Sequence, residues 1–242
     1  MPSLSELLSH PPYADLGPDE GLPPVFPAGV PAGVETWAGV RADILRRWRG
    51  ILGEPVPEEF ERTPRHVRTV ELPDAVAEEH LLPTSRESFQ RVALLRPRSA
   101  GRSPRPGAVV PFYNPEAMVG YDLERGAALE TTTVQFGRHL VEQGYVVVCG
   151  QAFPYNTVPD PGTGFTFDWW RTAAHTLLAR HPRWTCMGRL ISDTWIATDF
   201  FLSQADVDAE RVDLMINSLG GKQEVYNGCL DARIKAIVAS DF

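Results

Sequence analysis

Lysine, cysteine and long apolar runs are all scarce in this chain of 242 residues, and each scarcity excludes a class of function. The formal net charge is -8 and the only lysines are Lys222 and Lys235, so we expect no basic face that would hold nucleic acid. No apolar run approaches the ~20 residues that cross a membrane. The N-terminus also lacks the basic and apolar regions of a secretory signal. The sequence therefore predicts a cytoplasmic protein that binds neither nucleic acid nor a membrane.

Cys149, Cys186 and Cys229 are odd in number and widely spaced. This spacing matches neither a disulfide framework nor a zinc site. We therefore expect three reduced thiols and no bound metal.

Proline and glycine are concentrated at the start of the chain, in residues 1–32. Proline restricts the backbone and removes hydrogen-bond donors, so this segment is expected to be an extended lead-in. Residues 33–242 are expected to form one domain that begins with a helix over about 34–52. Strands are expected over 66–72 and 88–96.

Short, continuous apolar runs cover residues 107–113 and 145–149, and a helix is expected between them, over 129–143. Such runs are typical of strands that are covered on both faces. The strand–helix–strand alternation predicts a three-layer α/β/α fold with a mostly parallel, doubly wound sheet. A further helix is expected over about 190–203, and a strand over 211–216.

The regular alternation is interrupted at about 151–185, where a loop rich in proline and glycine leads into the aromatic stretch around Trp169. Long excursions at strand ends often form lids or pocket walls. Asp168, Trp169 and Trp170 are therefore candidates for lining an acyl or sugar pocket, although such clusters more often form local core.

Ser218 follows the strand at 211–216 and precedes a glycine pair, Gly220 and Gly221, that opens a helix. This order matches most of a nucleophile elbow, in which a strained turn exposes a serine hydroxyl above the sheet edge. The N–H of Leu219 would lie at the helix N-terminus and could donate to an oxyanion. One position departs from the motif: Ile216 replaces a small residue and is expected to crowd the turn.

From about Gly107 onward, the chain resembles the dienelactone-hydrolase-like and acetylxylan-esterase-like branch of the α/β-hydrolases. The resemblance rests on segments 109–113, 136–148 and 207–222, and on the run 230–241. It implies a serine esterase that needs no metal or organic cofactor. It also implies that the family fold continues past the end of this chain, so we expect a C-terminally truncated domain. Its last strand, within 234–239, would then be an open edge available for self-association.

The resemblance also supplies candidate partners for Ser218. Asp241 lies where the related glucuronoyl esterases carry the acid that orients the base, and its alternative role is a solvated strand-end aspartate. A backbone N–H near Phe112 or Tyr113 is the candidate second oxyanion donor. Lys222 corresponds to a lysine that contacts the sugar acid in those enzymes, whereas Leu219 replaces their arginine, which argues against a uronate ester.

No histidine follows Ser218, although the fold places its catalytic base there. His175 and His181 lie in the excursion and could fold over the site, but surface positions are the default for all six histidines. Two functions therefore stay open. One is a carboxylic-ester hydrolase, acetyl-ester or dienelactone-like, that acts on a small-molecule or sugar ester through an acyl-enzyme at Ser218. The other is a truncated, catalytically inactive hydrolase-fold protein that serves as a binding or assembly module.

Overall fold

The computed structural model describes residues 24–53, 60–86, 88–98, 101, 103–130, 134–159, 162 and 167–240. The chain divides into two compact units, Met1–Arg46 and Arg47–Phe242. In the first unit, the ring of Phe26 lies 6.1 Å from that of Trp37. Helix α2 (Val34–Leu52) begins in this unit and ends in the second, and it matches the expected helix.

The second unit is built on a seven-stranded sheet with the order β1-β2-β3-β7-β4-β8-β9. Strands β1, β2, β3 and β7 pair antiparallel, whereas β7, β4, β8 and β9 pair parallel. Five of the seven strands therefore point the same way, which confirms the expected, mostly parallel sheet. The strands are β1 (Arg65–Glu71), β2 (Ala75–Pro83), β3 (Phe89–Pro97), β4 (Arg105–Phe112), β7 (Val146–Gln151), β8 (Val207–Asn217) and β9 (Ala236–Ser240).

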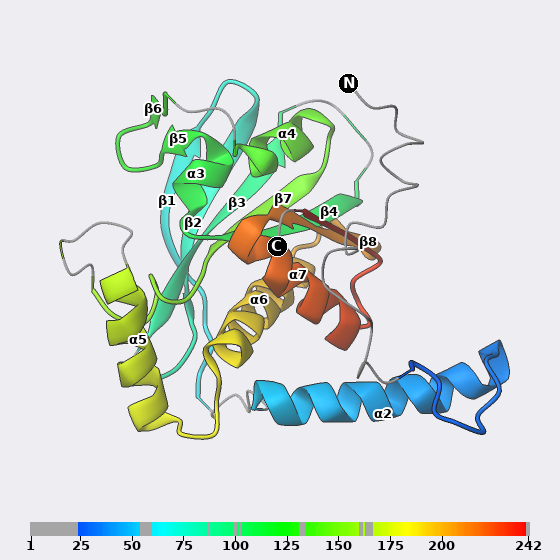
Figure 1. Ribbon diagram of the computed structural model, residues 1–242. Coiled ribbons are helices and arrows are strands. Elements are labelled where there is room, and N and C mark those ends of the chain that lie inside the picture. The colour runs from blue at the N-terminus through cyan, green and yellow to red at the C-terminus, as the bar shows by residue number, and fades with distance from the viewer. Residues whose placement is uncertain are drawn as a thin grey trace, which may run out of the picture. The chain divides into compact units, whose positions relative to one another are not determined.

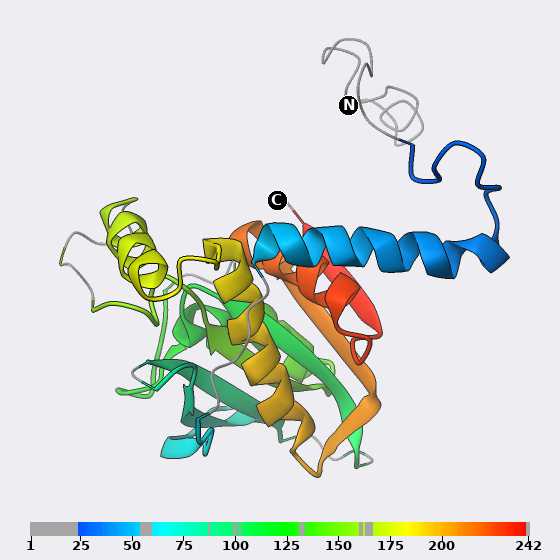
Figure 2. The same cartoon turned by 90° about the horizontal axis from the view of Figure 1, so that it is seen from below.

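Helices cover both faces of this sheet (Figures 1 and 2). Successive side chains of a strand point to opposite faces, and in β3 Val92 packs with the cluster that contains α6 (Cys186–Leu202). Its neighbour Ala93 packs instead with the cluster that contains α3 (Pro115–Val119) and α4 (Phe136–Glu142). Helix α7 (Ser218–Leu230) joins β8 to β9. The three-layer α/β/α architecture is thus confirmed.

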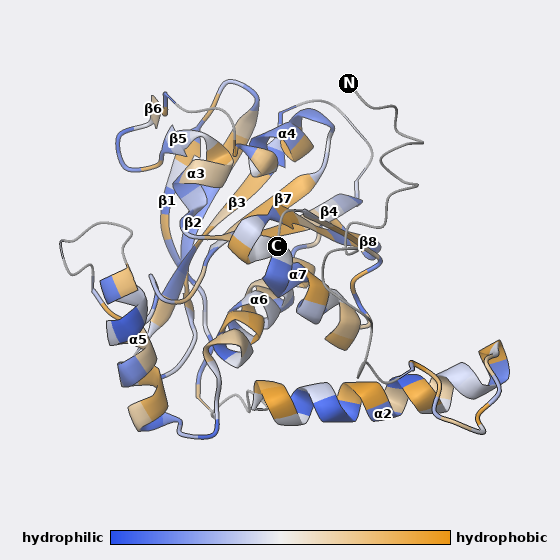
Figure 3. Ribbon diagram, viewed as in Figure 1, coloured by the Kyte–Doolittle hydropathy of each residue, from blue (hydrophilic) through white to orange (hydrophobic). Residues whose placement is uncertain are grey.

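The core lies along the central strands. β3 and β7 are hydrophobic along most of their length, whereas β1 and β2 carry many hydrophilic positions (Figure 3). Cys149 on β7 is fully buried, Cys186 is half-buried and Cys229 is exposed, and no disulfide joins them. Within the described ranges, no helix combines the length and the apolarity that a membrane span requires.

The helix expected over 129–143 is shorter in the structure: α4 runs from Phe136 to Glu142. Just before it, Ala127–Ala128 form β6, which pairs with β5 (Tyr121–Asp122) in a small hairpin. Residues 131–133 lie outside the described residues. The expectation was therefore wrong at its start, because the Leu129 N–H still belongs to the hairpin and donates to the Gly120 carbonyl at 2.9 Å.

The excursion after β7 packs against the body of the domain. Ala152 and Phe153 cluster with residues of α5 (Phe167–Arg180), with Leu190 of α6 and with the partly buried Leu219. The excursion thus contacts the residue that follows Ser218.

β9 lies at the end of the sheet and pairs only with β8 in the described residues. Its side chains Ile237 and Val238 are 39% and 53% exposed. Self-association through this edge stays a prediction.

Candidate active site

Ser218 lies at a junction with no intervening loop: β8 ends at Asn217 and α7 begins at Ser218. Its φ is +57°, and it is the one non-glycine residue with a positive φ in the described parts of the chain. This conformation is unfavourable for a residue with a Cβ and persists where the surrounding structure imposes it. The junction is therefore a sharp strand-to-helix turn that holds Ser218 in a strained conformation.

Close packing explains why the turn needs Gly220. A Cβ at this position would lie 2.3 Å from Cγ2 of Ile216 and 2.4 Å from the carbonyl oxygen of Pro111. Ile216 is 2% exposed and belongs to the core. The side chain of Ile216 thus occupies the space above Gly220. The turn is therefore crowded by Ile216, as its branched side chain led us to expect, and Ser218 still adopts the strained conformation.

The end of β4 lies beside the elbow, because β4 pairs with β8 and Pro111 approaches Gly220. Phe112 is 8% exposed and its ring lies 4.4 Å from that of Tyr113. The N–H groups of the first helical turn have no intrahelical acceptor, so the Leu219 N–H is free of such a bond. The fold therefore brings Ser218, Leu219 and the Phe112–Tyr113 pair to the same edge of the sheet.

A cavity of about 660 Å³ opens beside Tyr113. We call it the aromatic cavity; it is lined by Arg68, Glu79, Arg91, Tyr113, Asn114, Glu116, Ala117, Asp122, Glu124, Leu129, Gln151, Tyr155 and Trp169. Its lining includes Trp169 but not Lys222, which is exposed on α7. The structure therefore brings together two of the predicted site residues here, Tyr113 and Trp169.

Tyr155 links the aromatic residues of this cavity. Its ring lies 5.4 Å from Tyr113 and 4.7 Å from Trp169, edge-on in both cases. The Trp169 indole N–H donates to the Val158 carbonyl at 3.3 Å, and Trp169 is 8% exposed. Burial raises the pKa of the Tyr155 phenol, so this hydroxyl stays neutral near pH 7.

The opposite wall carries a charged group that sequence reasoning missed. Glu79, 3% exposed, accepts from Nε of Arg91 at 2.7 Å and lies 2.8 Å from Nε of Arg68. Arg91 also contacts Glu116. Burial lowers the pKa of Arg91, but hydrogen bonds and attraction from Glu116 and Glu79 outweigh it and raise the pKa overall.

None of the described histidines forms a hydrogen bond with Ser218. His139 is exposed on α4, and His175 is exposed on α5. His181 stacks on Trp184, with ring centroids 5.0 Å apart, and lines a different cavity. Within residues 24–240, as far as they are described, no hydrogen bond joins a histidine to Ser218. Asp241, the expected orienting acid, lies outside the described residues.

No described cluster of three or more histidine, cysteine, aspartate or glutamate side chains could hold a metal ion.

Comparison with known proteins gives the fold a wider context. No protein-family model matches the sequence, and no curated protein sequence matches it. Solved structures do match: a candidate acetyl xylan esterase from Bacteroides fragilis has a TM-score of 0.72 at 16% identity, over 86% of this chain and 54% of that one.

A glucuronoyl esterase from Solibacter usitatus has a TM-score of 0.63 at 17% identity, over 91% of this chain and 63% of that one. Acetyl xylan esterase 1 from a Thermoanaerobacterium species has a TM-score of 0.53 at 15% identity, over 81% and 56% of the two chains. The chain thus spans less than two thirds of the length of each of these proteins. The chain shares the fold of these three esterases.

Proposed function

We propose that this chain is a serine carboxylic-ester hydrolase, with Ser218 as the nucleophile. The positive φ of Ser218 at a strand–helix junction is the observation that carries the proposal. Such strain costs about 1–3 kcal/mol, and it concentrates at active sites. A turn that merely joined a strand to a helix would have no need to hold a serine in this conformation.

The chemistry follows from the position of the hydroxyl. Ser218 Oγ attacks the ester carbonyl carbon while a base takes its proton, and the carbonyl oxygen becomes an oxyanion. The Leu219 N–H, aided by the partial positive charge of the α7 N-terminus, stabilises that oxyanion, with a backbone N–H near Phe112 or Tyr113 as second donor. The C–O bond to the alcohol then breaks, and water hydrolyses the acyl-serine. The described histidines supply no base that is bonded to Ser218, so the proposal assigns the nucleophile and the oxyanion donors only.

The aromatic cavity supports a polar alcohol portion in the ester, such as a sugar. Tyr113, Tyr155 and Trp169 give it apolar walls, and Glu116 and Asp122 add acceptors for hydroxyl groups. A pocket that combines aromatic surface with a few polar groups fixes the orientation of a small ligand. The acetyl ester named for two of the neighbours is in keeping with a sugar as the alcohol, and an acetyl ester is the simplest candidate.

Covalent labelling tests Ser218 independently of turnover. We expect a fluorophosphonate probe to add one mass increment to the protein and peptide mapping to place it on Ser218, because the elbow exposes Oγ next to oxyanion donors. The Ser218→Ala variant should lose the adduct, whereas Ser203→Ala, at the exposed end of α6, should keep it. Labelling that is absent from the wild type, or unchanged in Ser218→Ala, refutes the assignment.

Hydrolysis of p-nitrophenyl acetate then distinguishes the two functions. The alternative, a non-catalytic binding or assembly module, is favoured by the lack of any described histidine bonded to Ser218. Wild type that exceeds Ser218→Ala by at least tenfold supports the esterase. Equal rates at background, together with specific labelling, would instead identify a nucleophile without its base.

A further inference from the structure

The short loop after β7, residues 152–157, borders both the candidate oxyanion donors and the aromatic cavity. The Ala152 N–H donates to the Phe112 carbonyl at 3.0 Å, at the end of β4. Ala152 also belongs to the apolar cluster against which Leu219 packs. Three residues further along, Tyr155 forms part of the cavity wall. A shift of this loop would therefore move the cavity wall relative to the groups that act on the ester.

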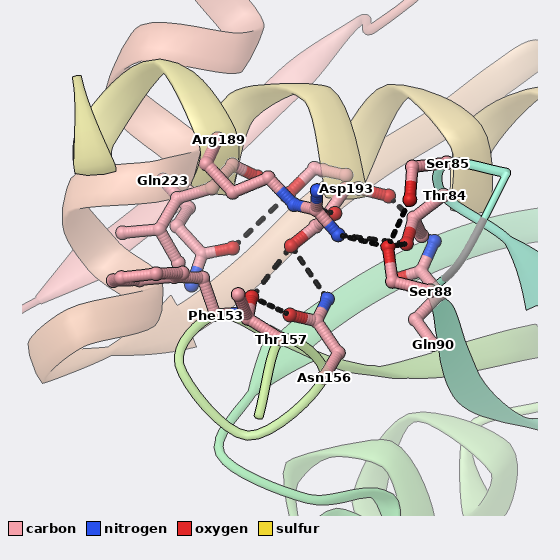
Figure 4. Close-up of polar contacts among 12 residues, drawn as sticks. Thr84, Ser85, Ser88, Gln90, Phe153, Asn156, Thr157, Arg189, Asp193 and Gln223 are labelled. Carbon is pink, nitrogen blue, oxygen red and sulfur yellow. Dashed lines mark hydrogen bonds and ion pairs between the residues drawn. The ribbon is translucent and has the colours of Figure 1, made fainter. Parts of the chain in front are cut away.

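Asp193 of α6 holds this loop on both sides of Tyr155. Its Oδ2 accepts a hydrogen bond from the Phe153 N–H at 3.3 Å and another from Nδ2 of Asn156 at 2.6 Å (Figure 4). Asp193 is 1% exposed, so water does not compete for these bonds. Hydrogen bonds to a carboxylate are stronger than those between neutral groups. The loop is thus fixed at two residues that flank Tyr155 in the sequence.

Asp193 is itself fixed by the opposite side of the domain. Its Oδ1 accepts from Nε of Arg189 at 2.9 Å, and Arg189 is 3% exposed. Nη2 of Arg189 donates to the hydroxyls of Thr84, at 2.7 Å, and Ser88, at 3.3 Å, in the β2–β3 connection (Figure 4). The Asp193 carbonyl accepts from Nε2 of Gln90 on β3 at 2.8 Å. The carboxylate therefore has a rigid mount from which it can hold the loop.

Stability alone explains this network poorly, because a buried ion pair stabilises a fold little in comparison with apolar packing of the same volume. Placement explains it better, since small displacements of the groups that hold a substrate cost binding and rate. We propose that Asp193 is a positioning residue: through Phe153 and Asn156 it holds Tyr155 in the wall that receives the sugar portion of the ester. This inference rests on the proposed function.

The test variant is Asn156→Ala. Asp193→Ala would leave Arg189 as an unpaired buried charge and disturb the fold, whereas Asn156→Ala keeps the ion pair and removes the shorter bond between Asp193 and the loop. Thr198→Ala is the matched control. Thr198 is 1% exposed on α6, and its hydroxyl donates to the Thr194 carbonyl at 2.8 Å, within the helix. Each variant thus loses a buried hydrogen bond, but only one of these bonds reaches the loop.

Protection of Ser218 from the fluorophosphonate probe by methyl β-xyloside measures how well the wall receives a sugar. Protection is expressed relative to the same variant without xyloside, so a change in the labelling rate itself cancels. We expect saturable protection of the wild type and of Thr198→Ala at the same xyloside concentration. Asn156→Ala should need about tenfold more xyloside for half-protection. Hydrogen exchange in the peptide that spans 152–157 should accelerate in Asn156→Ala alone.

The possible failures can be told apart. A wild type that does not label at Ser218 refutes the proposed function, and the positioning role falls with it. A wild type that labels but is not protected by xyloside overturns only the positioning role, because the wall then receives no sugar. Unchanged protection or unchanged exchange in Asn156→Ala also overturns it. So does an equal loss of protection in Thr198→Ala, because the effect would then follow stability and not the loop.

Discussion

Glu224 lies six residues after Ser218 on α7 and is fully buried. Neither of its carboxyl oxygens has a hydrogen-bond partner of ordinary geometry. Burial raises the pKa of Glu224 from 4.5 to about 9, and the nearby Ile216 N–H opposes this only weakly. The carboxyl is therefore neutral in the folded protein near pH 7 and ionised in the unfolded chain.

The consequence for stability has a definite sign. Because the folded state holds a proton that the unfolded state releases, the free energy of unfolding falls as pH rises from 4.5 to about 9. Each pH unit inside this window costs about 1.4 kcal/mol. By pH 7 the loss from this one side chain is about 3 kcal/mol relative to pH 4.5.

Replacement of Glu224 by glutamine keeps the shape and removes the titration. We expect Glu224→Gln to match the wild type near pH 5 and to exceed its free energy of unfolding by about 3 kcal/mol at pH 7. Urea unfolding at several pH values from 5 to 8 measures the difference, in which the other titrating groups cancel. Glu210→Gln, whose wild-type side chain is 84% exposed, is the control and should change little. A constant difference between Glu224→Gln and wild type across this range would refute the reasoning.

Two further predictions concern packing. Gly220→Ala should lower the free energy of unfolding by about 1–3 kcal/mol or more, because the new Cβ meets the Pro111 backbone and Ile216. Gly50 has open space around it, so the control Gly50→Ala should be neutral or stabilising in the same urea titration. Asp193→Ala should cost about 3–5 kcal/mol because it leaves a buried guanidinium unpaired, and adding Arg189→Met should recover much of this loss. If Asp193→Ala alone and Asp193→Ala combined with Arg189→Met lose the same free energy of unfolding, the ion-pair account is contradicted.

The parallel half of the sheet could be predicted from short apolar runs. The runs at 107–113 and 145–149 became β4 and β7, since strands covered on both faces need little polar patterning. β2 was missed because Glu78, Glu79 and His80 interrupt its apolar character. Glu79 is buried only because Arg68 and Arg91 reach it from the neighbouring strands, a pairing that single-strand patterns do not contain.

The candidate site shows the same division. Ser218 could be singled out because a strand, a serine and a glycine follow one another in the sequence. The cavity lined by Arg86, Arg180 and Arg189 could not be predicted, because these residues come from three separate elements and only the packing of the excursion brings them together. Lys222, implied by resemblance, lies exposed on α7, since helical periodicity turns it away from the buried face that Gly220 and Glu224 occupy.

The short loop after β7 lines two separate cavities. Tyr155 lines the aromatic cavity, Thr157 lines a second cavity together with Arg189, and Asp193 holds the loop through Phe153 and Asn156. Thermodynamic linkage is reciprocal: a ligand that moves this loop from one side changes the affinity for a ligand on the other side by the same factor in both directions. A ligand in either cavity therefore contacts the same short loop.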